Sequence, residues 1–293
     1  MAAAPGPVAL VTSRADPHGG ENDAPLVPAL AEAGVQATWV IWDDVTVDWS
    51  SFRAVVVRSP WDYTERYEEF LAWIDRVGAT TAVWNPPELL RWNSHKGYLL
   101  ELGQRGLPTV PTLLVRAWEA CPDLDHLVQA NGWDELVLKP AVSVGAKGTT
   151  RWGAADAVSG GPAAVELGRL HAAGDVLVQP FVPEIGAAGE TSVVFLGGRY
   201  SHAVRKVPAA GDFRVHAHHG GREIPTQALP DEIRLARQTL AALDVPTLYA
   251  RVDCVAVGGM PVLMELEVLE PDLFLTFDEL APARFAAALT AVW

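Results

Sequence analysis

The sequence has few cysteines, few positive charges and no long hydrophobic runs. Its 293 residues contain two cysteines, Cys121 and Cys254. Because two isolated cysteines form neither a disulfide framework nor a zinc-ligand pattern, we expect both to be small apolar residues in a reducing compartment. The 22 lysines and arginines are outnumbered by 36 acidic residues, for a net charge of −14. This balance argues against a nucleic-acid partner, since nucleic-acid-binding proteins present basic patches.

No stretch approaches the 18 consecutive apolar residues of a transmembrane helix, so we expect no membrane partner either. The first residues, MAAAPGPVALVTS, lack the basic start and the long apolar core of a secretory signal. These absences predict a cytoplasmic protein. The 49% of hydrophobic and 20% of charged residues are typical of a globular chain. The length allows two or three domains with a substantial core, and it is compatible with a homodimer.

Strands and helices alternate over residues 8–92. Short apolar runs, which are typical of buried parallel strands, occur at 8–12, 36–42, 52–57 and 81–85. Helices are expected at 26–33 and at 65–77, the second of them capped by Thr64. This alternation predicts a small doubly wound α/β domain, in which ligands lie beyond the carboxyl ends of the strands.

The third of these strands ends in the segment RSPWDY, residues 58–63, which is dense in polar and aromatic groups. Arg58 can hold a substrate carboxylate through two hydrogen bonds. Ser59, Trp61 and Tyr63 are candidate substrate contacts beside it. The alternative is an ordinary surface arginine.

The rest of the chain alternates less regularly. Helices are expected at 95–104, 123–131, 231–243 and 282–292, and strands at 113–115, 135–139 and 175–179. Two hairpins are expected, one over 190–206 that turns at Gly197-Gly198, and one over 251–268 that turns at Gly258-Gly259.

The second hairpin carries three carboxylates. Because side chains alternate between the faces of a strand, Asp253 projects from one face of the first strand, and Glu265 and Glu267 share a face of the second. The residues expected to point into the core are Met264, Leu266 and Val268. Carboxylates that lie close together repel each other, and Mg²⁺ relieves this repulsion by binding their oxygens together with substrate phosphates. The alternative is a solvated strand face paired with Lys or Arg across the sheet.

Residues 143–149, SVGAKGT, form a loop of small residues. Backbone N–H groups in such a loop can approach phosphate oxygens, and Lys147 adds a positive charge. The spacing is neither a P-loop nor a dinucleotide fingerprint, so an ordinary turn is the alternative. Lys139 ends an apolar strand, where a buried ammonium group needs an anionic partner. Lys96 lies near the positive end of a helix dipole, where a cation suits a bound polyphosphate.

The order of these features resembles the ATP-grasp superfamily from about residue 93 to residue 293. The segments QPFV, GETSVVFLGG and AVRKVPAAGDFRVHAHHGG within 179–221 are similar to the branch of glutathione synthetases and ribosomal-protein glutamate ligases. This resemblance implies an α/β fold, with α+β lobes. An N-terminal Rossmann-like domain over 1–92 would precede a central ATP-grasp lobe over 93–183 and a C-terminal lobe with the metal site over 184–293.

The resemblance also implies residue roles. The implied ATP-binding residues are Lys96, Lys139, Ser143, Val144, Gly145, Ala146, Lys147, Gly148, Gln179, Pro180, Phe181, Val182 and Glu190. The implied catalytic residues are Arg205 and Lys206, with Arg205 stabilising the transferring phosphoryl group. Asp253, Glu265 and Glu267 would hold two Mg²⁺ ions, and the implied substrate contacts are Arg214 and His216.

Three positions depart from the family pattern. Glu267 stands where Asn is usual, which keeps an oxygen ligand and adds negative charge, and Glu270-Pro271 replaces a turn of small residues. His216 stands where Asn is often found. The segments RSPWDY, WNSHKGYL and ELEVLEPDLFL are similar to a narrower subgroup that closes O-ureido-serine into an isoxazolidinone ring in cycloserine biosynthesis.

The resemblance implies a ligase that converts the carboxylate of a small amino-acid-like substrate into an acyl phosphate with Mg²⁺ and ATP. A nitrogen nucleophile then attacks, and ADP and phosphate are released. The most specific expectation is ring closure of O-ureido-D-serine to D-cycloserine. The alternatives are an intermolecular carboxylate–amine ligase, a small-molecule kinase on the same fold, and a binding module that retains ATP. The loops 143–149 and 208–221 are expected to act as lids.

Overall fold

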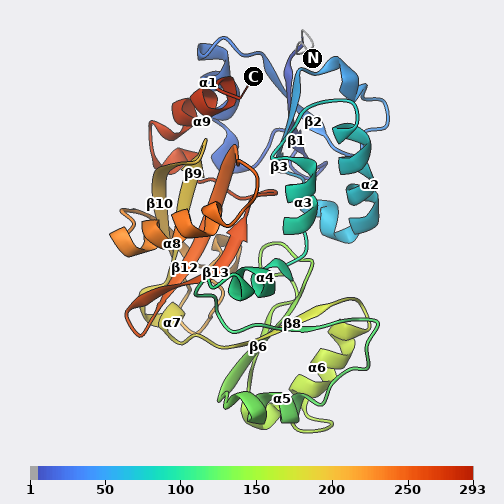
Figure 1. Cartoon of the computed structure of the whole chain (residues 1–293), viewed down its shortest axis with the longest axis vertical. Coiled ribbons are helices and arrows are strands. Elements are labelled where there is room, and N and C mark those ends of the chain that lie inside the picture. The colour runs from blue at the N-terminus through green and yellow to red at the C-terminus, as the bar shows by residue number, and fades with distance from the viewer. Residues whose placement is uncertain (1–5, 293) are drawn as a thin grey trace.

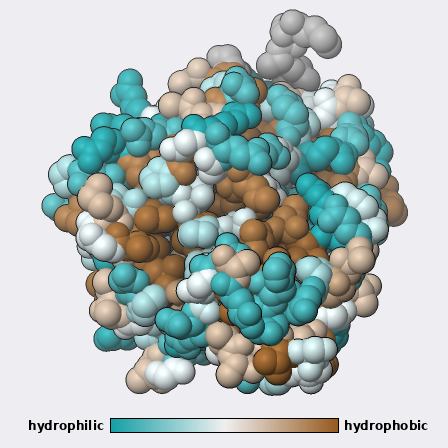
Figure 2. All heavy atoms as spheres, turned by 60° about the horizontal axis from the view of Figure 1, so that its bottom comes forward, coloured by the Kyte–Doolittle hydropathy of each residue, from teal (hydrophilic) through white to brown (hydrophobic). Residues whose placement is uncertain are grey.

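The computed structural model describes residues 6–292, apart from the side chain of His218. The first residues of the chain, from which we expect no secretory signal, lie partly outside this range, as does residue 293. The described residues form three sheets that follow one another along the long axis of the molecule (Figure 1). Figure 2 shows apolar residues across the middle of the face toward the viewer, with hydrophilic side chains around them.

The first sheet is parallel, with the order β2-β1-β3-β4. Its strands are β1 (Val8–Thr12), β2 (Ala37–Ile41), β3 (Ala54–Ser59) and β4 (Val83–Trp84). The connecting helices are α1 (Leu26–Glu32) and α2 (Tyr67–Gly78), and α3 (Pro87–Asn93) follows β4. The predicted doubly wound unit is therefore present, and β1 and β3 are buried along their whole length, as continuous apolar runs require.

The central sheet is antiparallel, with the order β5-β8-β6-β7. Its strands are β5 (Leu113–Val115), β6 (Glu135–Pro140), β7 (Thr150–Gly153) and β8 (Val176–Pro180). The helices α5 (Leu124–Asn131) and α6 (Pro162–His171) pack on it around a core of their own (Figure 1). The sheet is reached through α4 (Tyr98–Gln104).

The third sheet is antiparallel, with the order β11-β10-β9-β12-β13. Its strands are β9 (Glu190–Leu196), β10 (Arg199–Val207), β11 (Arg222–Thr226), β12 (Tyr249–Val257) and β13 (Met260–Glu267). One face is covered by α8 (Pro230–Ala241), and α7 (Glu184–Ala188) precedes the sheet. The last helix, α9 (Ala281–Thr290), returns to pack against α1 (Figure 1).

Both glycine-turned hairpins form as predicted, but two helix starts are corrected. Thr64 lies within a 3₁₀ helix, Trp61–Glu65, and α2 begins only at Tyr67. The helix expected at 95–104 begins only at Tyr98, as α4. It is preceded by α3, a helix that we did not predict and that begins at Pro87, where the missing N–H of proline costs nothing. The other 3₁₀ helices are Glu21–Asp23, Trp49–Ser51, Ala154–Ala157, Ala217–His219 and Leu275–Phe277.

Asn85 ties the first sheet to the third. Its Nδ2 donates to the carbonyl oxygens of Tyr249 at 2.9 Å and Val268 at 2.7 Å, and its Oδ1 accepts from the N–H of Leu248 at 2.6 Å. The residue is completely buried. The proposed domains, 1–92, 93–183 and 184–293, stay a prediction. Within residues 6–292, no helix is long and apolar enough to cross a membrane.

Candidate active site

A cleft opens where the three sheets meet. The N-terminal domain contributes Tyr63, the central sheet contributes Lys139 and Gln179, and the third sheet contributes Glu190 and Glu265. The cleft therefore gathers chemical groups from all three predicted domains.

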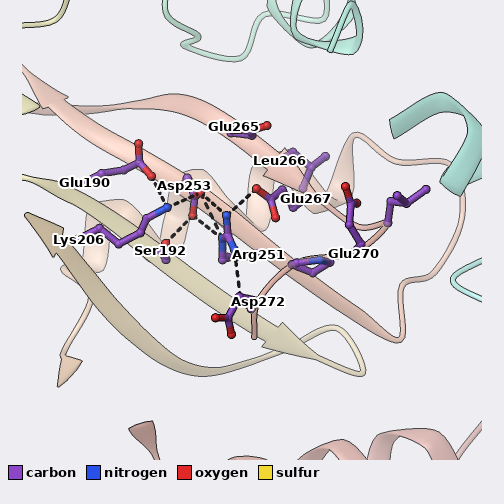
Figure 3. A network of polar contacts seen from close by, with 12 residues as sticks. Glu190, Ser192, Lys206, Arg251, Asp253, Glu265, Leu266, Glu267, Glu270 and Asp272 are labelled. Atoms are coloured by element: carbon purple, nitrogen blue, oxygen red, sulfur yellow. Dashed lines mark hydrogen bonds and ion pairs between the residues drawn. The ribbon is translucent and has the colours of Figure 1, made fainter. Parts of the chain in front are cut away.

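The three carboxylates of the terminal hairpin lie together on one face. Asp253 on β12 is paired with Glu265 on β13, and Glu267 is two residues farther along the same strand. Oxygen atoms of the three residues all lie within 4.8 Å of one another (Figure 3). Asp253 is 1% exposed, so its part of this face is not solvated. The pairing with Lys and Arg that the alternative expected is nevertheless present. An all-oxygen donor set of this size fits a hard divalent cation such as Mg²⁺.

Three cations contact this cluster. Lys206 Nζ lies 2.9 Å from an Asp253 oxygen and 2.5 Å from a Glu190 oxygen. Arg251 Nη2 lies 2.9 Å from Asp253 and 2.6 Å from Glu267 (Figure 3). The third cation, Lys96, forms an ion pair with Glu265. Buried carboxylates need such partners, because desolvation without them is costly.

The cations hold two of the three carboxylates ionised. Burial raises the pKa of the Asp253 carboxyl, but Arg251 and Lys206 outweigh burial and hold this pKa well below its usual range. Burial likewise opposes ionisation of Glu265, yet Lys96 and Lys139 lower its pKa to about 2. Burial raises the pKa of Glu267 to about 8, because Arg251 offsets only part of the penalty. The three cations therefore do not fully offset the cost of burying these carboxylates, and a further cation would be bound favourably.

Arg205 is not on the cleft face, which corrects its predicted catalytic role. Its Nη1 donates to the carbonyl oxygen of Ala188 at 2.9 Å, and its Nη2 lies 3.6 Å from Glu232 on α8. Neighbouring residues of a strand point to opposite faces, so Lys206 lies on the cleft side. Sequence reasoning also missed Arg251. The available signal was the Arg-x-Asp spacing, which places Arg251 and Asp253 on one face of β12.

This difference predicts opposite outcomes for two adjacent substitutions. Lys206→Met is expected to lower kcat/KM by about 100-fold or more, because Glu190 at the cleft and Asp253 buried behind it lose their shared cation. Arg205→Met is expected to change kcat/KM by less than about threefold, since the side chain contacts α8 and the end of α7. Steady-state phosphate release measures both. A larger loss for Arg205→Met at unchanged thermal stability would contradict the placement.

The predicted nucleotide residues divide into two groups. Most line the cleft, among them Lys139, which is 9% exposed and makes no ion pair within residues 6–292. Burial lowers its pKa. Gln179 lines the cleft and donates to Thr112 Oγ1 at 2.8 Å. Lys147 instead points outward to an exposed ion pair with Glu65, and Gly148 lies outside the lining. The residues that line the cleft as predicted are Lys96, Ser143, Val144, Gly145, Ala146, Pro180, Phe181, Val182 and Glu190.

Met264 also lines the cleft, although the alternating pattern placed it in the core. The pairing of β12 with β13 shifts between Asp253 and Cys254, which leaves Met264 as the extra residue of a β-bulge. Met264 packs there against an apolar cluster that contains Val110, Val182 and Ile185. This cluster gives the cleft an apolar wall.

Two predicted substrate contacts are corrected. Arg58 is 0% exposed and lies 2.9 Å from Asp23, and Ser59 Oγ lies 3.0 Å from Thr12 Oγ1. Neither residue lines the cleft, because β3 runs on through Ser59 inside the first domain.

The other four candidates lie at or near the cleft. Tyr63, Arg214 and His216 line it, and Trp61 donates to the carbonyl oxygen of Glu270. Arg214 forms an ion pair with Asp212. These four assignments stay predictions.

Comparison with known protein families assigns both halves of the chain. Residues 111–278 match the ATP-grasp domain of prokaryotic glutathione synthetase. The chain belongs to the ATP-grasp ligases. Residues 8–85 match the N-terminal domain of D-cycloserine synthetase DcsG.

This ATP-grasp ligase is similar over its whole length to the cycloserine biosynthesis protein DcsG of Streptomyces lavendulae. The two are 36% identical over 300 residues, which cover 97% of this chain and 98% of that protein. Glutathione synthetase of Prochlorococcus marinus (strain MIT 9313) is 27% identical over 258 residues, or 87% of this chain and 77% of that protein.

Comparison with solved structures shows the same similarity. The crystal structure of D-cycloserine synthetase DcsG has a TM-score of 0.87 at 35% identity, over 98% of this chain and 99% of that chain. D-alanine–D-alanine ligase from Bacillus anthracis shares the fold, with a TM-score of 0.66 at 12% identity over 97% and 95% of the two chains.

The enzyme class follows from the family. This ATP-grasp ligase is a carbon–nitrogen ligase that uses ATP and Mg²⁺ to join a carboxylate to an amine. The sequence predictions of family, fold and enzyme class are confirmed.

Proposed function

We propose that this ligase closes O-ureido-D-serine to D-cycloserine. The observation that carries the proposal is the similarity to D-cycloserine synthetase along the whole chain, including the N-terminal domain. That domain contributes Tyr63 to the cleft, beside the third sheet. A small amino-acid-like substrate, a cytoplasmic location, a homodimer and the absence of a nucleic-acid partner belong to the same proposal.

The first step transfers a phosphoryl group. The substrate carboxylate attacks the γ-phosphorus of ATP, ADP leaves, and an acyl phosphate forms. Asp253, Glu265 and Glu267 would hold two Mg²⁺ ions, which when bound neutralise the charge that develops on the phosphate oxygens. Lys139 and the backbone of residues 143–146 would contact the triphosphate, and the apolar wall around Met264 would contact the adenine.

The second step closes the ring. The ureido nitrogen bonded to oxygen attacks the acyl carbon, the nitrogen loses its proton and inorganic phosphate leaves. D-cycloserine has no carbamoyl group, so water must also cleave the bond between the ring nitrogen and the carbamoyl carbon, with release of carbon dioxide and ammonia. Burial of Asp253 and Lys206 keeps bulk water away from the carboxylate cluster. Exclusion of water protects an acyl phosphate from hydrolysis.

The proposal predicts phosphate release that depends on O-ureido-D-serine. With Mg²⁺ and ATP, the purified enzyme should release ADP and phosphate in equal amounts and form D-cycloserine, which mass spectrometry identifies. EDTA should abolish the reaction. Phosphate release with two separate amino acids, but not with O-ureido-D-serine, would replace ring closure by intermolecular ligation. A phosphorylated product with no free phosphate would contradict ligation altogether.

A further inference from the structure

The turn after β13, residues 270–272, is held by side chains from two domains. Each of its three carbonyl oxygens accepts one hydrogen bond. The three bonds run from Trp61 Nε1 to Glu270 at 3.1 Å, from Arg58 Nη2 to Pro271 at 2.9 Å and from Arg251 Nη1 to Asp272 at 3.1 Å. Residues 58–63 and the turn 270–272 therefore form one structural unit. This turn carries Glu270-Pro271, where small residues are usual in the family. This unit fixes the direction of the Glu270 side chain.

Glu270 lines the cleft and is 8% exposed. The Tyr63 hydroxyl is close enough to this carboxylate to lower the pKa of Glu270. Figure 3 shows Glu270 next to Glu267, on the opposite side of the carboxylate cluster from Glu190. Tyr63 is 2% exposed, so the pair is held rigidly at the wall of the cleft that the N-terminal domain provides.

Among the described acidic residues that line the cleft, Glu270 differs from the others in forming no ion pair. Within residues 6–292, Glu190 pairs with Lys206, Glu265 with Lys96 and Glu267 with Arg251, whereas Glu270 forms no ion pair. Burial raises its pKa to about 7, and Lys96 and Tyr63 offset only part of this rise. A buried carboxylate that lines a cleft and forms no ion pair with the described part of the protein calls for a cationic group on the ligand.

We propose that Glu270 and Tyr63 bind the α-ammonium group of the amino-acid substrate. The inference rests on the proposed function, in which the substrate carboxylate reaches the phosphate beside Glu265 and Glu267. An α-ammonium group is one carbon away from that carboxylate, which places it next to the cluster, where Glu270 lies. Its three N–H groups can donate to the carboxylate and to the tyrosine oxygen. The cleft thereby selects a free amino acid over one with an acylated or missing amino group.

Equilibrium binding tests the inference without depending on turnover. Calorimetry with Mg²⁺ and a non-hydrolysable ATP analogue compares O-ureido-D-serine with 3-(ureidooxy)propanoate, which lacks only the amino group. Glu270→Gln is expected to weaken binding of O-ureido-D-serine by about 10- to 100-fold, the effect of losing a charged hydrogen bond. Binding of 3-(ureidooxy)propanoate should change by less than about threefold. Tyr63→Phe should show the same selectivity with a smaller loss.

Glu69→Gln is the matched control, because it removes an exposed carboxylate of the same domain and should change neither affinity. Glutamine has the size of glutamate, so the melting temperature of Glu270→Gln should not fall. Equal losses for both ligands would overturn the inference, as would a loss confined to Mg²⁺ or to the nucleotide, which would make Glu270 a metal ligand.

The same experiment separates this inference from the proposed function. Glu270-dependent binding of O-ureido-D-serine without its conversion to D-cycloserine would overturn the function and support the ammonium site. Conversion with an affinity that does not depend on Glu270 would support the function and overturn the site.

Discussion

Glu265→Gln is expected to lower kcat for phosphate release by at least about 1000-fold, equivalent to about 4 kcal/mol of transition-state stabilisation. Glu265 lies in the three-carboxylate cluster and forms the ion pair with Lys96. The amide keeps the shape of the side chain but removes the charge that a divalent cation needs. It also leaves the ammonium group of Lys96 without its partner. Phosphate release at saturating ATP measures the loss, and a titration with Mg²⁺ should show half-saturation at a higher concentration.

The control for this variant is Glu166→Gln, which removes a carboxylate on α6 that pairs with Arg169 far from the cluster. It should retain the wild-type kcat. Circular dichroism at the assay temperature should show Glu265→Gln folded. A folded Glu265→Gln enzyme with kcat within tenfold of wild type would remove Glu265 from the metal site.

The second large effect concerns stability. Asn85→Leu is expected to lower the free energy of unfolding by about 3–5 kcal/mol, because three buried backbone groups lose their hydrogen-bond partner. For a chain of this size, the melting temperature should fall by about 6–15 °C. The lost bonds join the first sheet to Leu248, Tyr249 and Val268 in the third. The substitution therefore tests whether the N-terminal domain is held to the third sheet through this side chain.

Asn131→Leu provides the comparison. Asn131 is exposed at the end of α5, where its Nδ2 donates to the carbonyl oxygen of Leu127, so its replacement should cost less than about 1 kcal/mol. Asn85 does not line the cleft. Asn85→Leu enzyme that stays folded should bind ATP normally. Equal melting temperatures for the two variants would show that the Asn85 contacts contribute little.

The arrangement around residues 270–272 connects stability with specificity. Arg251 contacts the carboxylates of Asp253 and Glu267 with one nitrogen and the carbonyl oxygen of Asp272 with another. Arg58, buried in the first domain, holds the neighbouring carbonyl oxygen of Pro271. The position of the N-terminal domain thus fixes the geometry of the turn that carries Glu270.

Local patterns in the sequence determined the two hairpins and the family assignment. The alternation of side chains along a strand is a fixed property of the backbone, so the sequence alone placed Glu265 and Glu267 on one face of their strand. Asp253 joins them only because the β-bulge at Met264 pairs it with Glu265. The glycine pairs at 197–198 and 258–259 likewise specified the two turns. The order of these features along the chain was sufficient to identify the ATP-grasp family, because each of them is local.

Only the tertiary structure determined whether a side chain faces the cleft or a helix, and which residues it contacts. The alternation along a strand puts Arg205 and Lys206 on opposite faces, but it does not show which of these faces α8 covers. In the structure, α8 covers the face of Arg205. The same pattern cannot show that β3 continues and encloses Arg58, or that a β-bulge turns Met264 into the cleft. Glu270 acquired its place only through contacts with residues about 200 positions earlier in the chain. Such contacts depend on how the sheets pack, and no local pattern encodes that packing.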